Sequence, residues 1–149
     1  MVLPKNGRTS WPDFLELFER LRLESERPGT VLLVEGERDR RALRRLGIQG
    51  PIVLVHHGRT LSELAQELIR SGQRVIILTD WDAEGGHLAH RIREFLAPGV
   101  TPPDLDYRRR LAIVLKGEIV HVEGLASWAR RMAERAGAPL DHFLTTEGP

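Results

Sequence analysis

The stretch Val75-Ile76-Ile77-Leu78-Thr79-Asp80-Trp81-Asp82-Ala83-Glu84-Gly85-Gly86 joins an apolar run to three carboxylates at alternate positions. A short apolar run of this kind is typical of a buried strand. Because a buried strand has no room for charge, Asp80, Asp82 and Glu84 are expected to emerge together at its carboxyl end, where open α/β sheets hold ligands. Carboxylates crowded in this way repel one another, and a divalent cation relieves the repulsion. The stretch therefore predicts a metal site at the edge of a sheet.

A second stretch, Val31-Leu32-Leu33-Val34-Glu35-Gly36, repeats the arrangement with one carboxylate. Its valine-rich run is too short for a helix and fits a strand that is buried on both faces. Glu35 is therefore expected across the crevice from the other acids, whose charges should raise its pKa. A raised pKa suits proton transfer to or from an oxygen.

Strands and helices are expected to alternate along most of the chain. Strands are predicted at 31–34, 52–55 and 74–79, with short strand candidates at 111–115 and 118–122. Helices are predicted at about 38–46, 60–70, 86–96 and 125–137, and 100–107 is expected to be an exposed loop. Thr60 and Glu63 have the spacing of a capping box at the start of a helix. The alternation predicts an α/β fold with a central, mostly parallel sheet of about four strands, flanked by helices.

An amphipathic helix is predicted before the first strand, because Phe14, Leu17, Phe18 and Leu21 form an apolar stripe at helical spacing. The stripe packs either against the rest of the domain or against a second copy of the chain, so a homodimer is possible. The expected organisation is a tail and helix at 1–28, one α/β domain at 29–138 and a tail at 139–149.

The composition limits the class of protein. The formal net charge is only +1 over 149 residues, so a surface that attracts nucleic acid has to be a local basic patch. The chain has no cysteine, which excludes disulfides and thiolate metal sites and fits a reducing cytoplasm. No run approaches the roughly 20 apolar residues that a membrane span needs. We expect a cytoplasmic protein with no membrane partner.

The two acidic stretches together resemble the Toprim domain. In that family Glu-Gly ends one strand and Asp-x-Asp-x-Glu-Gly ends another, as they do here about 45 residues apart. The domain is the catalytic module shared by topoisomerases, bacterial-type primases, OLD-type nucleases and small ribosomal-RNA maturation nucleases. The resemblance covers residues 30–125 and is strongest to the small stand-alone Toprim proteins of archaea and some bacteria. It implies a Rossmann-like Toprim fold.

The resemblance also implies roles for single residues. Glu35 matches the proposed general acid or base, and Asp80 and Asp82 match the pair that binds Mg²⁺, for which Mn²⁺ is a possible substitute. Glu84 matches the third acid of the type IA topoisomerases, whose motif reads Asp-Pro-Asp-Arg-Glu-Gly-Glu. Trp81 stands here in place of the proline and Gly86 in place of the last glutamate, and neither change removes a metal ligand.

Two further groups are candidates for phosphate contact. Arg38, Arg41 and Arg45 share one side of the predicted helix that follows Glu35, and form either a solvated basic face or a contact surface for phosphates. Gly85 and Gly86 form either a tight turn or a place where a phosphate approaches backbone N–H groups at a helix start.

Several polar residues keep alternative interpretations. Asp80 and Asp82 could instead cap the following helix. Glu123 either adds a fourth acid or caps the last helix, and capping is the stronger interpretation. The remaining candidates for substrate contact are His56, His57, His87 and the run Arg108-Arg109-Arg110.

The function predicted from these observations is Mg²⁺-dependent phosphoryl transfer on RNA or DNA, of a nuclease-like kind. The alternative is a non-catalytic nucleic-acid or ribonucleoprotein binding module in which the metal bridges protein to phosphate. An enzyme that acts on a small nucleotide is a third, weaker possibility. A complete topoisomerase or primase is not expected, because the catalytic tyrosine of the former and the flanking domains of the latter have no counterpart here.

Overall fold

A computed structural model describes residues 11–137 of the chain. The helices are α1 (Trp11–Ser25), α2 (Glu37–Arg45), α3 (Leu61–Arg70), α4 (Ala83–Leu96), α5 (Asp106–Leu115), η2 (Val122–Gly124) and α6 (Leu125–Arg135). The strands are β1 (Thr30–Val34), β2 (Ile52–Leu54) and β3 (Arg74–Ile77). Residues 1–10 of the predicted tail and helix, and the whole tail predicted at 139–149, lie outside the described residues.

The three strands form a parallel sheet in the order β2-β1-β3. Strand β1 is in the middle, with Leu32 opposite Ile52 on one side and Leu33 opposite Ile77 on the other. Every residue of β1 is buried, because helices cover both faces of the sheet. The predicted parallel α/β fold with an N-terminal amphipathic helix is confirmed.

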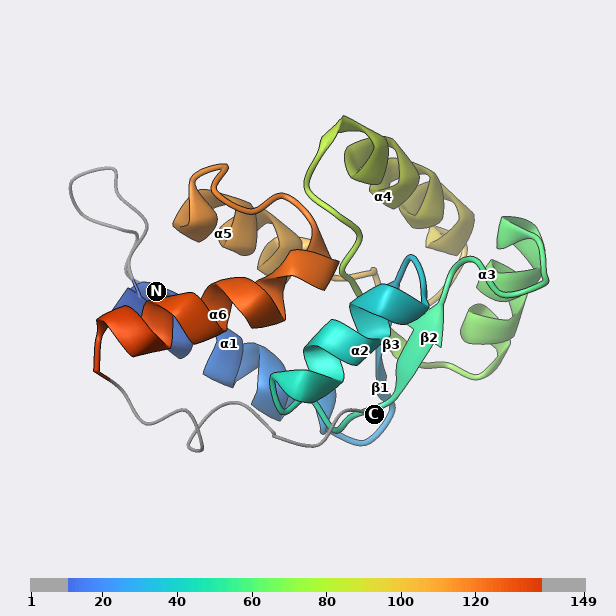
Figure 1. The fold of residues 1–149 in the computed structure, drawn as a ribbon. Helices are drawn as coiled ribbons and strands as arrows, with labels where there is room; N and C mark the ends of the chain where they lie inside the picture. The colour runs from blue at the N-terminus through green and yellow to red at the C-terminus, as the bar shows by residue number, and fades with distance from the viewer. Residues whose placement is uncertain (1–10, 138–149) are drawn as a thin grey trace.

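The two faces of the sheet belong to two separate apolar cores. Leu32 and Val34 point into the larger core, which is closed by α1, α2, α5 and α6. Val31 and Leu33 point into the smaller core beneath α3 and α4. Figure 1 shows the resulting layers, with α3 and α4 on one side of the sheet and the other helices on the opposite side. The side-chain alternation of one strand therefore organises the whole domain.

The strands predicted at 111–115 and 118–122 are wrong. The first segment is the second half of α5, where Leu111, Val114 and Leu115 are buried at helical spacing, and the second is irregular and leads into η2. A short apolar run does not by itself distinguish a strand from a buried helix. Here Asp106 favours the helix, because its carboxylate pairs with Arg109 and Arg110 one turn further on.

The segment before α5 occupies the place next to β3 that a fourth strand would take. Asp104 forms a single parallel bridge with Ile76, in which Ile77 N–H donates to the Asp104 carbonyl and Asp104 N–H donates to the Val75 carbonyl, both at 2.8 Å. The expected loop at 100–107 therefore ends at Leu105 and covers the edge of β3. In the described part of the chain the sheet has three strands rather than about four.

Helix α1 packs within the chain. Phe14, Leu17, Phe18 and Leu21 are fully buried, and the Phe14 ring meets the Trp128 ring of α6 edge-on, with the centroids 4.8 Å apart. The apolar stripe that suggested a homodimer is thus covered by the chain's own helices, and the homodimer stays a prediction. No helix within residues 11–137 combines the length and the apolar character that crossing a membrane requires.

Candidate metal centre

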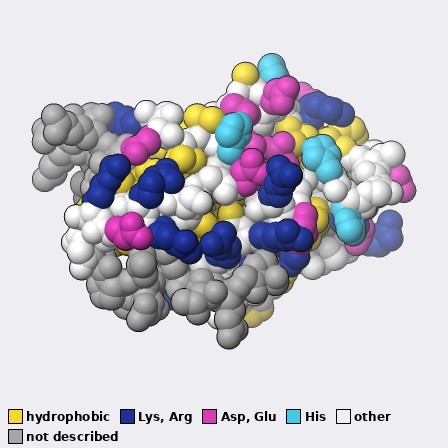
Figure 2. All heavy atoms as spheres, in the orientation of Figure 1, with side chains coloured by type: hydrophobic (Ala, Val, Ile, Leu, Met, Phe, Trp, Pro, Cys, Tyr) yellow, Lys and Arg dark blue, Asp and Glu magenta, His cyan; other side chains and the backbone are white. Residues whose placement is uncertain are grey.

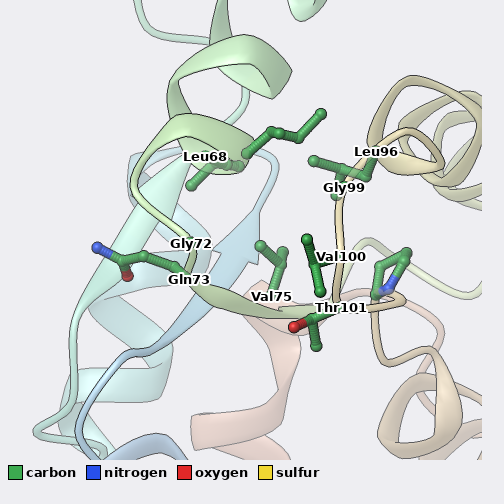
Figure 3. Close-up of a pocket in the computed structure, with 10 residues that line it drawn as sticks. Leu68, Gly72, Gln73, Val75, Leu96, Gly99, Val100 and Thr101 are labelled. Atoms are coloured by element: carbon green, nitrogen blue, oxygen red, sulfur yellow. The ribbon is translucent and has the colours of Figure 1, made fainter.

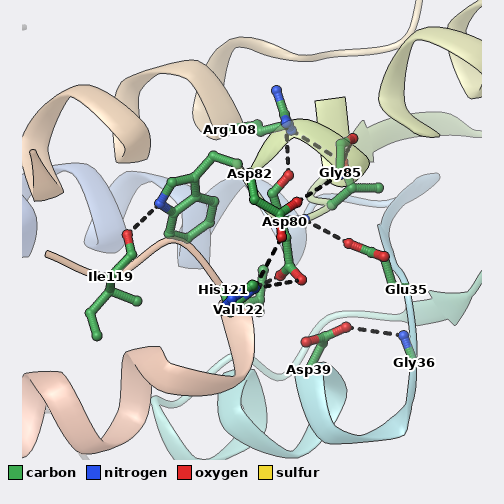
Figure 4. Close-up of polar contacts among 12 residues, drawn as sticks. Glu35, Gly36, Asp39, Asp80, Asp82, Gly85, Arg108, Ile119, His121 and Val122 are labelled. Carbon is green, nitrogen blue, oxygen red and sulfur yellow. Dashed lines mark hydrogen bonds and ion pairs between the residues drawn. The ribbon is translucent and has the colours of Figure 1, made fainter. Parts of the chain in front are cut away.

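Two carboxylates and one imidazole meet at the carboxyl end of β3. One possible ligand atom each from Asp80, Asp82 and His121 lies within 4.8 Å of the other two. The Nδ1 atom of His121 is 3.1 Å from Asp80 Oδ2 and 3.4 Å from Asp82 Oδ2 (Figure 4). The hydrogen bond and the charge of Asp80 raise the pKa of His121. The crowded acids predicted from the sequence are present, with a histidine that the sequence did not assign to them.

Glu35 joins this group from the end of β1. Its Oε2 atom accepts the backbone N–H of Asp80 at 2.9 Å, so the ends of β1 and β3 are tied together as expected for neighbouring parallel strands. Burial is the main cause that raises the pKa of Glu35, and the charges of Asp80 and Asp39 add to it. Sequence reasoning had attributed the raised pKa to neighbouring acids, which are the smaller contribution.

Asp80 is held in place by the segment that precedes α6. Its Oδ1 atom accepts the backbone N–H of Val122 at 2.8 Å, and its Oδ2 atom faces His121. A carboxylate oxygen has two lone pairs, so Asp80 keeps the capacity to bind an ion while it holds these contacts.

Asp82 has the capping role that the sequence offered as one alternative, and its position leaves the metal role open. It is the N-cap of α4, and its Oδ1 atom accepts the backbone N–H of Gly85 at 2.8 Å. Its Oδ2 atom takes part in the group with His121. Glu84 is different, because it lies exposed in the first turn of α4 and is not one of the three residues whose ligand atoms meet.

Gly85 allows α4 to approach the metal centre closely. A Cβ atom at this position would lie 1.8 Å from the carbonyl oxygen of Asp80, which no side chain tolerates. A Cβ atom at Gly86 would meet only Arg108 Nη2, at an ordinary 3.5 Å. Close packing therefore requires glycine at position 85 but not at position 86. The predicted phosphate contact at this helix start stays a prediction.

Arg108 of α5 forms hydrogen bonds to the turn between β3 and α4. Its Nη2 atom donates to the Asp80 carbonyl at 2.7 Å and its Nε atom donates to the hydroxyl of Thr79 at 3.1 Å. The buried Thr79 hydroxyl donates in turn to the Gly85 carbonyl. Of the run Arg108-Arg109-Arg110, Arg108 thus contacts the candidate metal centre, whereas Arg109 and Arg110 pair with Asp106.

Asp39 is a buried acid that sequence reasoning missed. Its side chain accepts the backbone N–H of Gly36 at 3.0 Å, and the backbone N–H of Glu123 in η2 lies near enough to lower its pKa. Burial raises the pKa of Asp39. The sequence did hold one indication, because Asp39 is the third residue of α2 and can receive the N–H of the residue before the helix. Asp39 therefore joins the turn after β1 to η2.

The predicted phosphate contacts on α2 do share one surface. Arg38, Arg41 and Arg45 line one open hollow together with Glu123 and Gly124. Figure 2 shows acidic side chains gathered near the middle of this face, with histidines beside them and a row of basic side chains below, over α2 and α6. Glu123 is exposed and is not one of the three residues in the metal group.

The remaining candidates are not members of this group. His56, His57 and His87 are exposed, and none of them is among the three residues that meet. A cavity of about 180 Å³ lies at the opposite end of the sheet, where Leu68, Val75 and Leu96 line it (Figure 3). None of the described residues that line this cavity is acidic, so it offers no carboxylate ligand for a metal.

The donor atoms fit a divalent metal ion. Carboxylate oxygens are the ligands that Mg²⁺ and Mn²⁺ take in proteins, whereas an imidazole nitrogen is more typical of other transition metals. Asp80 and Asp82 therefore suit Mg²⁺ or Mn²⁺, with His121 as a hydrogen-bond partner of Asp80.

Comparisons with known proteins agree with the fold. The family model of the Toprim domain matches residues 30–114. A UPF0292 protein of Methanosarcina acetivorans is 35% identical over 130 residues, which span 85% of this chain and 90% of the relative. A UPF0292 protein of Thermococcus kodakarensis is 38% identical over 112 residues, spanning 75% and 80%. A solved structure of a protein from Aquifex aeolicus superposes with a TM-score of 0.62 at 26% identity and covers 80% of this chain and 98% of that one.

Asp82→Asn should weaken Mg²⁺ binding by at least about tenfold, because the asparagine loses the charge while it keeps the oxygen that caps α4. The free energy of unfolding without metal should stay the same or rise, since one repulsive charge is gone. Isothermal calorimetry and urea unfolding measure the two effects. The matched control is Glu84→Gln, which should change Mg²⁺ affinity by no more than about twofold. An equal loss of Mg²⁺ affinity in both variants would contradict a metal site formed by Asp82 and Asp80.

Gly85→Ala should lower the free energy of unfolding by about 1–3 kcal/mol or more, because the new methyl group collides with the Asp80 carbonyl. Gly86→Ala is the control in the next position of the same helix. It should raise stability by up to about 1 kcal/mol, since alanine favours the helix and meets no obstacle. Denaturant unfolding of both variants measures the difference, and equal stabilities would be inconsistent with the close approach of α4.

Proposed function

The chain belongs to the Toprim domain family, and we propose that it is a metal-dependent enzyme that cuts the sugar–phosphate backbone of nucleic acid. One observation carries the proposal. The carboxylate of Glu35, whose pKa is raised, accepts the N–H of Asp80 and so lies against the acidic pair that fits a metal. A proton-transfer group beside a cation site is the arrangement that phosphodiester hydrolysis needs.

Asp80 and Asp82 are the residues that would hold Mg²⁺ or Mn²⁺. When bound there, the ion supplies positive charge that polarises a phosphoryl oxygen. The chain itself fixes the position of both carboxylates through the backbone N–H groups of Val122 and Gly85. Residues that are already oriented need no rearrangement when substrate arrives.

Glu35 is the proposed proton carrier. Hydrolysis forms one P–O bond from water and breaks the P–O bond to the leaving oxygen, while one proton leaves the water and one proton ends on the leaving oxygen. Glu35 is about half buried, and burial disfavours its charged form. Its carboxylate can therefore take up a proton from the attacking water and release it again, which is general base catalysis.

The arginines of α2 are the proposed contacts for the nucleic-acid backbone. Arg38 directly follows the Glu35 turn and shares an open hollow with Arg41 and Arg45. Guanidinium groups pair well with phosphates, and such contacts supply much of the affinity of proteins for nucleic acid. This face would position a strand so that its phosphate lies over the metal centre.

Cleavage of labelled RNA or DNA should require Mg²⁺ or Mn²⁺ and stop when a chelator is added. Asp80→Asn should lower the rate by about a hundredfold or more, because it removes a metal ligand while the asparagine oxygen still accepts the Val122 N–H. Glu94→Gln, at an exposed carboxylate on α4, is the control and should cleave at the wild-type rate. Gel assays with varied RNA and DNA substrates provide the measurement. Metal-dependent binding without cleavage of any of them would favour the non-catalytic binding module instead.

Arg38→Ala combined with Arg41→Ala should weaken nucleic-acid binding and reduce the slope of log affinity against log salt by about one to two, because each lost phosphate contact removes about one released counterion. Binding isotherms at several salt concentrations measure the slope. The matched control replaces Arg70 and Arg93, which lie on α3 and α4, away from α2. An unchanged slope in the α2 variant would identify this helix face as ordinary solvated surface.

A further inference from the structure

A second open hollow lies beside the metal centre, on its α5 side. It is lined by four apolar side chains, two arginines and one aspartate that pairs with Arg109, namely Trp81, Leu105, Ala112, Ile113, Arg108, Arg109 and Asp106. The two candidate metal ligands Asp80 and Asp82 flank Trp81 in the sequence. A molecule held at the metal centre therefore has this apolar hollow as its immediate neighbour.

The Trp81 ring is a fixed platform in this hollow. Its indole N–H donates to the carbonyl of Ile119 and its backbone N–H donates to the carbonyl of Val120. The side chain also packs against the larger core yet stays partly exposed. Trp11 and Trp128 are instead buried in the core. A partly exposed aromatic ring that cannot turn offers a ready surface for stacking.

The charges around the metal centre indicate how a strand would cross it. Arg108 lies on one side of Asp80, and Asp39, on the helix that carries the basic face, lies on the other (Figure 4). Arg108 lines the hollow, and its hydrogen bonds go to a hydroxyl and a carbonyl. Within residues 11–137 its guanidinium forms no ion pair with a carboxylate, so a phosphate can approach it. On the proposed function, a strand held by α2 would pass over the acids and reach Trp81.

We propose that the hollow beside Trp81 receives one unpaired base of the bound strand, so that the substrate is single-stranded where it meets the metal centre. This inference rests on the proposed function. A base has a flat apolar face and polar edges, and it is the part of a nucleotide that stacks on aromatic side chains. In a duplex both faces of each base are already stacked, so a base enters such a hollow only from a single strand or after it is flipped out.

The test compares cleavage-resistant, phosphorothioate-linked single strands that carry an abasic residue at each position in turn, with Mg²⁺ present. At one position the missing base should weaken binding to the wild-type protein by roughly five- to a hundredfold. A blunt duplex of the same sequence should bind more weakly than the single strand. The fluorescence of Trp81 should also be quenched by the intact strand.

Two substitutions at Trp81 separate stacking from folding. Trp81→Leu and Trp81→Phe both lose the hydrogen bond to Ile119, but only phenylalanine keeps an aromatic face. The abasic penalty should shrink to about twofold or less in the leucine variant and persist in the phenylalanine variant. Ala112→Leu fills the hollow without changing Trp81 and should also remove the penalty. Thermal unfolding of each variant shows whether the fold is kept.

Each outcome of this test is decisive. If these strands bind and unmodified strands are cut in the gel assay, yet no abasic position is penalised, the base hollow is wrong while the proposed function stands. The same conclusion follows if the penalty survives in Trp81→Leu and Ala112→Leu. If no nucleic acid binds with or without Mg²⁺, both the hollow and the proposed function are wrong.

Discussion

The hydrogen bond from the Asp80 N–H to the Glu35 carboxylate is the contact on which the site depends, because it joins the ends of β1 and β3. The two strands are neighbours in a parallel sheet, so their carboxyl ends reach the same edge, and the bond then fixes the acid of one strand against the backbone of the other. The two carboxylates still repel each other, because the charge of Asp80 raises the pKa of Glu35, and the hydrogen bond holds them at one edge in spite of this repulsion. Through this bond they form one site.

Backbone N–H groups from several segments stabilise the carboxylates at the carboxyl edge of the sheet. Each of four carboxylates at this edge accepts at least one main-chain N–H, and the four are Glu35, Asp39, Asp80 and Asp82. Hydrogen bonds of this kind stabilise the charged form and partly offset the cost of burial. His121 adds a group whose raised pKa favours positive charge. The protein can therefore hold its carboxylates together before a cation arrives.

Helix α5 shows how one revised segment changes the functional surface. The sequence suggested a short strand at 111–115, but Leu111, Val114 and Leu115 pack into the core as one side of a helix. The start of that helix brings Arg108 against Asp80, and its exposed side forms the hollow with Trp81. A strand at this place would have supplied neither feature, since its side chains would alternate between two faces.

The sequence by itself determined the three parallel strands, the position of Glu35, Asp80 and Asp82 at their carboxyl edge, and the cap of α3, and it offered Asp82 as one possible cap of the next helix. Those conclusions rest on local rules. Charged residues that follow a buried strand lie at its end, and a cap lies within a few residues of its helix. Only the tertiary structure decided that His121, Asp39 and Arg108 join the site. It also decided that Glu84 is not one of the residues whose possible ligand atoms lie together. Val122 and His121 contact Asp80 across 42 and 41 residues of chain. Both lie at the start of η2 rather than at the end of a strand, so strand pairing does not predict these contacts as it predicts that of Glu35 with Asp80. Such contacts depend on how α5, η2 and α6 pack on the sheet, which the summed burial of the apolar cores decides.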